Sequence, residues 1–463
     1  MKKTILSTVA VLALTTSLSA TQFYVNDNGQ VFINPAPDRK ALTITNDYLE
    51  GEKTPVTNIV EVKPESKITI MNENSPDFIL GKETHINMKI VPDDNKDMWL
   101  KLGVRVQGTM ENEQVDYKGS GKTDTDTNDA YLRRVRLEVA AGFGHGTSFV
   151  MDIRNDKSNY GIENSEGQFS VGDAYVKIKK PFGTSLVNFK LYRAKIDVSR
   201  TETVKSARVI AYDRPYVADA AAQFISFNRR GANVQMYGDY KKKIHYQIAT
   251  GSATSPDKIK DAAGGKQSKS AEVTDSSFFY GGKIVFSPFD GWEETQRTET
   301  YMGVGKHFSF GASFWEVPSM EGNLNNGTKY DLNHRLVNLE ISGHYENLFL
   351  QAEYFKFQDV VEDWSATTLN TGDANGWYVT GEYVMPELGY IAPFFRYEEH
   401  DRFEDANDAK VTSKMAGVNW YLKGNTIKAG LYFQRDEYGR DAANNRGFEK
   451  DVDKIRLTSQ FFF

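Results

Sequence analysis

Basic side chains at every second position are the feature of this 463-residue sequence that could do chemistry. Arg134 and Arg136 alternate with apolar residues, and Lys177, Lys179 and Lys190 follow the same period. Successive residues of a β-strand point to opposite faces, so each basic set shares one face of its strand. Guanidinium and ammonium groups bind anions, the guanidinium through a planar fork of N–H donors. The pattern therefore predicts attraction of anions along strand faces rather than bond-breaking chemistry.

Further basic residues extend this set. Lys454 alternates with apolar residues near the C-terminus, as do Lys428 and Arg456. The polar segment 195–225 holds five basic residues (Lys195, Arg200, Lys205, Arg208, Arg214) against four acidic ones (Asp197, Glu202, Asp213, Asp219), a net charge of +1. The candidate selectivity residues are Arg134, Arg136, Lys177, Lys179, Lys190, Lys205, Arg208, Arg214, Lys428 and Arg456. The alternative is that they are only solvated, and paired with carboxylates such as Glu138, Glu340 and Glu382.

Catalysis and metal binding have little support. The sequence contains no cysteine, which excludes thiolate nucleophiles and thiolate metal ligands. Its seven histidines form no HxH or HxxxH pair, and no GxSxG motif accompanies His245 or His344. Residues 124–129 (DTDTND) could offer oxygen ligands to Ca²⁺, but they lack the glycine and distal glutamate of an EF-hand loop. We therefore expect no enzyme, no cofactor and no metal, and nothing indicates nucleic-acid binding.

The composition favours strands. Apolar residues make up 40% of the chain and aromatic residues 13%, with 24 Tyr and 28 Phe. A chain poor in aliphatic residues but rich in aromatic ones suits half-buried strands better than packed helices.

The N-terminus predicts export. Residues 1–20 combine Lys2 and Lys3 with an apolar stretch and a small-residue end, the pattern of a secretory signal peptide cut after Ala20. Without them the net charge becomes −8, because two of the 56 basic residues are lost against 62 acidic ones. No later run of about 18 apolar residues predicts a transmembrane helix. The mature protein is therefore expected to leave the cytoplasm and not to be held in the inner membrane.

Sixteen strands are predicted beyond residue 97. They are expected near 99–110, 130–140, 147–155, 171–180, 186–194, 226–238, 243–250, 278–287, 301–315, 334–345, 348–357, 376–385, 390–397, 412–423, 426–435 and 451–463. Long polar connections alternate with short turns, and 288–300 is the one long connection on the short-turn side. An even strand number with this alternation is typical of a transmembrane β-barrel. The last strand pairs an apolar face with a polar face and ends on the aromatic Phe463, a signal for assembly into the outer membrane.

The predicted organisation is all-β: a signal peptide at 1–20, a partly ordered periplasmic extension at 21–97, and a 16-stranded antiparallel transmembrane β-barrel with long extracellular loops at 98–463. On the barrel strands, charge on the lipid face is costly, so the basic faces should line a water-filled lumen. Arg133 has outward parity by the same rule, where it would meet lipopolysaccharide phosphates or a subunit contact.

Four segments resemble a known family. Residues 129–138 (DAYLRRVRLE) resemble the second-strand motif of the phosphate-selective porin O and P family, and 173–182 (DAYVKIKKPF) with 190–195 resembles its next strand pair. Residues 229–238 (RRGANVQMYG) and 417–428 (GVNWYLKGNTIK) are similar to later strands, and the terminal Phe463 also fits. The resemblance covers 97–463. It implies a trimeric 16-stranded channel whose third loop folds inward as a constriction.

The expected function is passive diffusion of small hydrophilic solutes and ions, with a mild preference for anions of the phosphate type. Lipid, lipopolysaccharide, the barrel-assembly machinery and two further copies of the chain are the expected partners. Two alternatives stay open: a general or weakly cation-selective porin, and a non-conducting barrel that serves structure or surface interaction.

Overall fold

The computed structural model describes residues 23–26, 31–32, 39–42, 98–119, 121–158, 169–226, 229–253, 271–289, 298–302, 306–324, 326–364, 369–406, 408–440 and 449–462. The chain divides into two compact units, 1–62 and 63–463. The first holds a small antiparallel sheet of β1 (Phe23–Asn26), β2 (Val31–Phe32) and β3 (Arg39–Leu42), in the order β2-β1-β3. The predicted signal peptide, most of the predicted extension and Phe463 lie outside the described residues.

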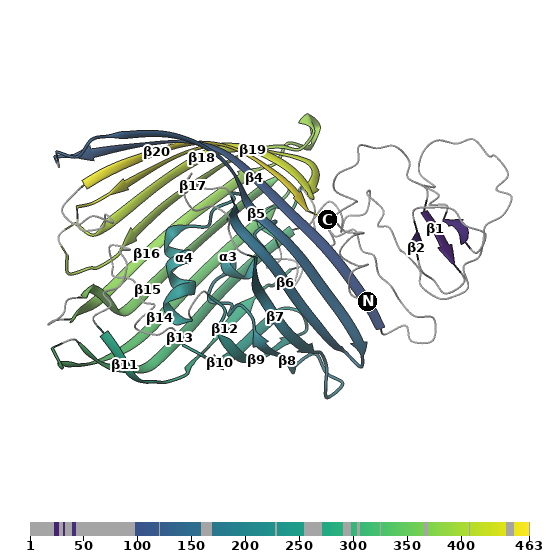
Figure 1. Cartoon of the computed structure of the whole chain (residues 1–463), viewed down its shortest axis with the longest axis horizontal. Coiled ribbons are helices and arrows are strands. Elements are labelled where there is room, and N and C mark those ends of the chain that lie inside the picture. The colour runs from purple at the N-terminus through teal and green to yellow at the C-terminus, as the bar shows by residue number, and fades with distance from the viewer. Residues whose placement is uncertain are drawn as a thin grey trace. The chain divides into compact units, whose positions relative to one another are not determined.

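A closed antiparallel barrel forms the second unit (Figure 1). Its strands are β4 (Met98–Lys118), β5 (Thr125–Gly144), β6 (Thr147–Ser158), β7 (Ser170–Ile178), β8 (Asn188–Arg193), β9 (Ala232–Tyr240), β10 (Ile244–Gly251), β11 (Ala271–Ser276), β12 (Phe279–Phe286), β13 (Lys306–Leu324), β14 (Lys329–Tyr345), β15 (Leu348–Trp364), β16 (Leu369–Tyr383), β17 (Ile391–Asp401), β18 (Lys410–Asn425), β19 (Ile427–Tyr438) and β20 (Glu449–Phe462). Both β11 and β12 pair with β13, so they are two parts of one strand. β20 pairs with β4 and closes the ring at sixteen strands, as predicted.

Several strands are longer than predicted. β4 has 21 residues, whereas about 9–11 residues cross the hydrocarbon layer. The additional residues lie beyond the lipid, where both faces can be polar and the alternation that predicts a strand disappears. In the opposite sense, β13 begins at Lys306 rather than at the predicted 301, because 301–302 leave the barrel wall.

The two faces of the last strand confirm the predicted parity. The side chains of Ile455, Leu457 and Phe461 are about half exposed on the outer face, while Arg456 and Gln460 are buried inside. Neighbouring strands repeat this pattern, with Leu431 and Phe433 outside and Gln434 inside on β19. The outer surface is therefore the apolar one.

The predicted outward direction of Arg133 is wrong. In the β4–β5 ladder, Gln107 pairs with Arg134 and Gly108 pairs with Leu132, so Arg133 is an extra residue at a β-bulge. A bulge places two successive side chains on the same side of the strand. Arg133 therefore points into the barrel, as Arg134 does, and its guanidinium reaches Asp213. Parity rules alone do not reveal such an insertion.

The connection between β8 and β9, residues 194–231, folds into the barrel and is called the inner loop here (Figure 1). It contains α3 (Arg200–Thr203) and α4 (Tyr216–Ile225). The side chain of Ser199 accepts a hydrogen bond from the Glu202 N–H and caps α3, and Pro215 directly precedes α4. Of the helices in the described part of the chain, none is long and apolar enough to cross a membrane.

Part of one wall of the lumen is apolar, which corrects the expectation of a polar, water-filled interior throughout. The buried face of α4, with Val217, Ala221 and Ile225, packs against the inner face of β13–β16. The apolar cluster on that wall includes Phe279, Trp315, Val317, Met320, Leu324, Leu332, Leu336, Phe355, Phe357, Val361 and Tyr378. The inner loop is thus fixed to one half of the barrel partly by a hydrophobic core, and the basic cavity of the lumen lies on its other side.

A second segment enters from the short-turn end. Residues 298–302, between β12 and β13, are called the strap here. They belong to the long connection that the sequence showed as an exception on that side. All five are buried, and Thr298, Glu299 and Tyr301 contact the inner loop.

Candidate functional site

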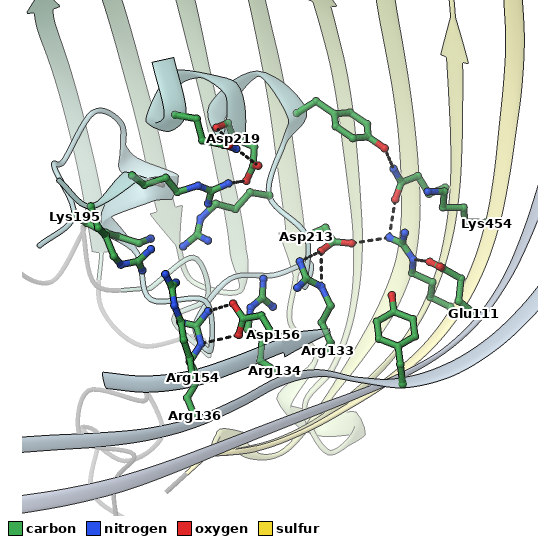
Figure 2. A pocket seen from close by; sticks show the side chains of 18 of the residues that line it. Glu111, Arg133, Arg134, Arg136, Arg154, Asp156, Lys195, Asp213, Asp219 and Lys454 are labelled. Atoms are coloured by element: carbon green, nitrogen blue, oxygen red, sulfur yellow. Dashed lines mark hydrogen bonds and ion pairs between the residues drawn. The ribbon is translucent and has the colours of Figure 1, made fainter. Parts of the chain in front are cut away.

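A cavity of about 660 Å³ lies between the inner loop and the strands β4–β6 and β17–β20 (Figure 2). Eleven basic and four acidic side chains line it, an excess of seven positive charges. The basic ones are Arg133, Arg134, Arg136, Arg154, Lys195, Arg214, Arg229, Arg230, Arg396, Lys454 and Arg456, and the acidic ones are Glu111, Asp156, Asp213 and Asp219. A concave, strongly basic surface of this kind concentrates anions.

Two neighbouring strands supply one wall of the cavity. Arg136 of β5 and Arg154 of β6 are register partners, and both face inward. The Arg136 guanidinium binds both oxygens of Asp156, at 3.2 and 2.7 Å. Arg154 has no hydrogen-bond or ion-pair partner among the residues that the structure describes. Its guanidinium donors therefore stay available to an anion in the cavity.

Asp213 of the inner loop connects two strands across the cavity (Figure 2). Its carboxylate accepts from the Arg133 guanidinium at 2.7 Å and from Arg456 Nη1 at 3.0 Å. Burial alone would raise the pKa of the Asp213 carboxyl, but Arg133 and Arg456 outweigh it and hold that pKa well below its usual range. The carboxylate thus stays charged and ties the loop to β5 and β20.

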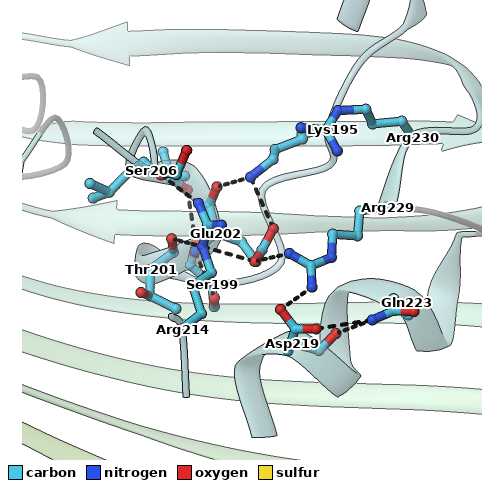
Figure 3. Close-up of polar contacts among 12 residues, drawn as sticks. Lys195, Ser199, Thr201, Glu202, Ser206, Arg214, Asp219, Gln223, Arg229 and Arg230 are labelled. Carbon is cyan, nitrogen blue, oxygen red and sulfur yellow. Dashed lines mark hydrogen bonds and ion pairs between the residues drawn. The ribbon is translucent and has the colours of Figure 1, made fainter. Parts of the chain in front are cut away.

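Glu202 organises the inner loop itself (Figure 3). Its side chain is fully buried, and its carboxylate lies 3.1 Å from Lys195 Nζ, 3.1 Å from Arg214 Nε and 3.2 Å from Arg229 Nη1. Burial would raise the pKa of the Glu202 carboxyl, yet Arg214, Lys195 and Arg229 together lower it below its usual value. Arg229 also pairs with Asp219 of α4. One carboxylate thereby neutralises part of the positive charge on this side of the cavity.

Six wall side chains hold the backbone of residues 206–213. Each donates to a different main-chain carbonyl of this segment, so most of its carbonyl oxygens have a hydrogen-bond partner inside the barrel. The pairs are Gln107 with Ser206 (3.2 Å), Gln460 with Ala207 (2.9 Å), Lys428 with Val209 (2.7 Å), Asn419 with Ile210 (3.1 Å), Arg134 with Tyr212 (3.0 Å) and Arg396 with Asp213 (2.8 Å). They come from β4, β20, β19, β18, β5 and β17, and together they fix the course of the loop.

The predicted selectivity residues have different surroundings. Arg134, Arg136, Arg214 and Arg456 line the cavity. Lys428 and Arg208 are buried, and Lys428 anchors the loop as described above. Lys177 Nζ and Lys190 Nζ lie 5.8 and 5.5 Å from the centre of the Tyr175 ring, and neither lysine lines this cavity. Lys179 is exposed just after the end of β7, and Lys205 is described below.

Seven basic lining residues were not among the candidate selectivity residues: Lys195 and Lys454, which were noted only as basic positions, and Arg133, Arg154, Arg229, Arg230 and Arg396. Arg154 and Arg396 do stand in alternating segments, so the period-two pattern could have revealed them. Arg229 and Arg230 belong to the predicted strand 226–238, but this start is wrong because β9 begins only at Ala232. Strand parity does not apply to the two arginines, and the folded loop brings them to the cavity.

The oxygen-rich segment 124–129 is used within its own hairpin. Asp126 accepts from the Asn112 side chain at 2.7 Å, and Asp124 accepts from the Tyr117 N–H at 2.9 Å. No group of three or more potential ligands in the described ranges could hold a metal ion.

Glu138 is the carboxylate that opposes the exposed lysine of the inner loop. Its two oxygens bind the buried Arg105 and Lys205 Nζ, the latter at 2.8 Å. Replacing Glu138 by Gln removes one negative charge and should raise the anion-to-cation permeability ratio by about 7-fold, since a unit charge about 7 Å away in water contributes about 0.6 kcal/mol to an anion and the opposite amount to a cation. The reversal potential in a KCl gradient measures this ratio. An unchanged reversal potential in Glu138→Gln would show that permeating ions do not pass near this carboxylate.

A closed barrel of sixteen strands, with a loop folded into a basic lumen, defines the chain as a porin. The family model described as "Phosphate-selective porin O and P" matches residues 104–463, and the chain belongs to this family. An uncharacterized protein of Aquifex aeolicus (strain VF5) is 25% identical over 418 residues, 83% of this chain and 92% of the relative. The crystal structure of the outer membrane channel DcaP of Acinetobacter baumannii is similar in fold, with a TM-score of 0.53 and 11% identity over 79% of this chain and 97% of that one. Family and fold point to a channel of the bacterial outer membrane.

Proposed function

We propose that the protein is an outer-membrane channel that prefers anions, with small phosphate-type oxyanions among its solutes. One observation carries the proposal: eleven basic side chains face four acidic ones around the cavity beside the inner loop. A ring of cations in a narrow aqueous passage raises the local anion concentration and lowers that of cations. No reaction, cofactor or energy source is involved, because solutes follow their own gradients.

The pairing of the basic residues supports passage rather than tight capture. Arg136, Arg133 and Arg456 each bind a carboxylate of the protein, so they offer an anion only part of their hydrogen-bonding capacity. Arg154, without such a partner in the described part of the chain, offers all of it. A channel conducts when each binding site is strong enough to attract an ion and weak enough to release it. Mild selectivity is the expected result.

Assembly and surroundings belong to the same proposal. We expect export by residues 1–20, insertion by the barrel-assembly machinery through the last strand and Phe463, and a homotrimer. The outer face of β4, β18, β19 and β20 carries ion pairs beyond its apolar band, among them Lys118 with Glu449 and Lys414 with Glu437. Charged side chains at this level suit contact with lipid head groups and lipopolysaccharide.

A planar bilayer under a KCl gradient tests the proposal. We expect stepwise conductance, a reversal potential on the anion side and a reduction of the chloride current by added phosphate. A cation-side or near-zero reversal potential would favour a general porin over the proposal. A correctly folded trimer without conductance would favour a structural or surface-interaction barrel.

A further inference from the structure

We infer that the strap, residues 298–302, positions the inner loop from the short-turn end of the barrel, and that Glu299 is the positioning residue through which it acts. The inference goes beyond the proposed function, because it concerns the steadiness of the open passage and not the sign of the ions that cross it. The inner loop enters from the long-loop end of the barrel, whereas the strap enters from the other end. The loop is thus held from both ends.

Glu299 uses both of its carboxylate oxygens on the inner loop. Oε1 accepts from Thr201 Oγ1 at 2.9 Å, and Oε2 accepts from the Ile210 N–H at 2.8 Å. Its own N–H donates to the Arg208 carbonyl at 3.0 Å. A buried carboxylate is costly unless hydrogen bonds stabilise it. Both oxygens of this one are satisfied by the loop, so loop and strap depend on each other.

Tyr301 and Arg200 make the second link. Arg200 of α3 is fully buried, and its Nη2 donates to the Thr298 carbonyl at 2.7 Å and to the Tyr301 hydroxyl at 3.2 Å. The Tyr301 ring stacks on His307 and His344 of the barrel wall, with centroid distances of 4.1 and 4.7 Å. The strap therefore connects α3 to β13 and β14. It transmits the rigidity of the wall to the loop.

These contacts have a specific place in the loop. The apolar face of α4 holds 217–225, and the six wall donors hold 206–213. The strap contacts residues 200 and 201 of α3, and it contacts residues 208 and 210 within the segment that the wall donors hold. Glu202, whose ion pairs reach the cavity, belongs to the same α3. Loss of the strap contacts should let α3 move and change the width of the passage beside Glu202.

Single-channel recording of the full-length protein tests this. Glu299→Gln keeps the size of the side chain but lacks the second acceptor oxygen, and Thr201→Val removes the partner hydroxyl without changing any charge. We expect each variant to replace the steady open level by rapid fluctuation among several sublevels, with at least about a 10-fold shorter dwell in the main level. The double variant should be no worse than the more affected single one. The reversal potential should stay unchanged, because Glu299 does not line the cavity.

Controls keep the result interpretable. Glu404→Gln removes a carboxylate that binds Lys356 at the long-loop end of the barrel. This variant should keep the steady open level of the single-channel current. Heat-modifiable gel migration shows whether each variant forms a barrel. Should Glu299→Gln fail to fold, Thr201→Val and Tyr301→Phe, which loses only the hydroxyl bound by Arg200, decide the question. Steady single-level currents in both folded variants would overturn the inference, even in a channel whose anion preference is as proposed.

Discussion

Replacing Arg154 by Glu is expected to lower the anion-to-cation permeability ratio by about 50-fold at low salt. Arg154 faces the cavity from β6 beside Arg136 and has no partner within the described residues that could compensate for its loss. The substitution changes the local charge by two units. Two unit charges about 7 Å apart in water interact by about 0.6 kcal/mol, so the change disfavours an anion in the cavity by about 1.2 kcal/mol and favours a cation by the same amount, about 2.4 kcal/mol in the ratio. The reversal potential under a KCl gradient gives the ratio directly.

Salt and a matched variant test the cause. The effect should decrease as ionic strength rises, because mobile ions screen charges beyond about 10 Å at 0.1 M. Lys414→Glu makes the same two-unit change on the outer face of β18, where Lys414 pairs with Glu437, and should leave the reversal potential unchanged. Equal shifts in both variants would indicate a general effect of net charge. No shift in Arg154→Glu would remove this residue from the permeation path.

Replacing Glu202 by Gln should destabilise the docked inner loop by about 3–5 kcal/mol, the usual cost of removing one partner of a buried ion pair. Glu202 is fully buried and neutralises Lys195, Arg214 and Arg229. Without its charge these three cations repel one another and lose their counter-ion. Hydrogen exchange of the amides in α3 and α4 measures the docking free energy, since exchange reports local opening.

Asp219 offers a matched comparison. Its carboxylate also pairs with Arg229, but it is 41% exposed at the cavity. Asp219→Asn should therefore cost under about 1 kcal/mol in the same exchange experiment, as exposed ion pairs do. If the α3 amides were equally protected from hydrogen exchange in the wild type and in Glu202→Gln, docking of the loop would not depend on neutralising Lys195, Arg214 and Arg229 with this carboxylate.

The pH dependence has a definite sign. The pKa of Glu202 is lowered in the folded protein from its usual 4.5, because the three cations outweigh the effect of burial. A group with a lowered pKa stabilises the fold above its ordinary pKa and loses that contribution as the pH falls through the lower folded value. Protection of α3 in the wild type should therefore be constant from pH 7 to about 5 and decrease below about pH 4. In Glu202→Gln this part of the acid dependence should be absent.

The barrel itself could be predicted from the sequence because its information is local. Strand faces repeat every two residues, and segments such as 427–434 and 451–462 keep one apolar and one polar face throughout. All sixteen strands were therefore found. At the long-loop end of the barrel many predicted strands were too short, because the two-residue period fades where a strand leaves the lipid. β4, with 21 residues, is an example.

The cavity was only partly predictable because it depends on the course of the inner loop. Arg134, Arg136 and Arg456 were identified by parity, whereas the direction of Arg133 depends on a single bulge in β5. Lys428 has the parity of a lumen residue, yet it is buried under the loop, where its Nζ binds two main-chain carbonyls. No local pattern tells whether an inward lysine meets water or backbone. In the sequence, the strap is indicated only by the connection 288–300, which is longer than the other connections on its side of the barrel.

The hydrophobic contact between α4 and the wall also bears on the order of folding. On the part of β13–β16 next to α4 both faces are apolar, the outer one toward lipid and the inner one toward α4. Before α4 is in place, residues such as Trp315, Leu336 and Phe355 would face the water of an empty lumen, an exposed apolar surface that favours aggregation. In ordinary barrels the wall can close first and the loops can settle afterwards. We therefore expect α4 to act as the internal template on which these strands close, so that ring closure and loop docking form one cooperative step.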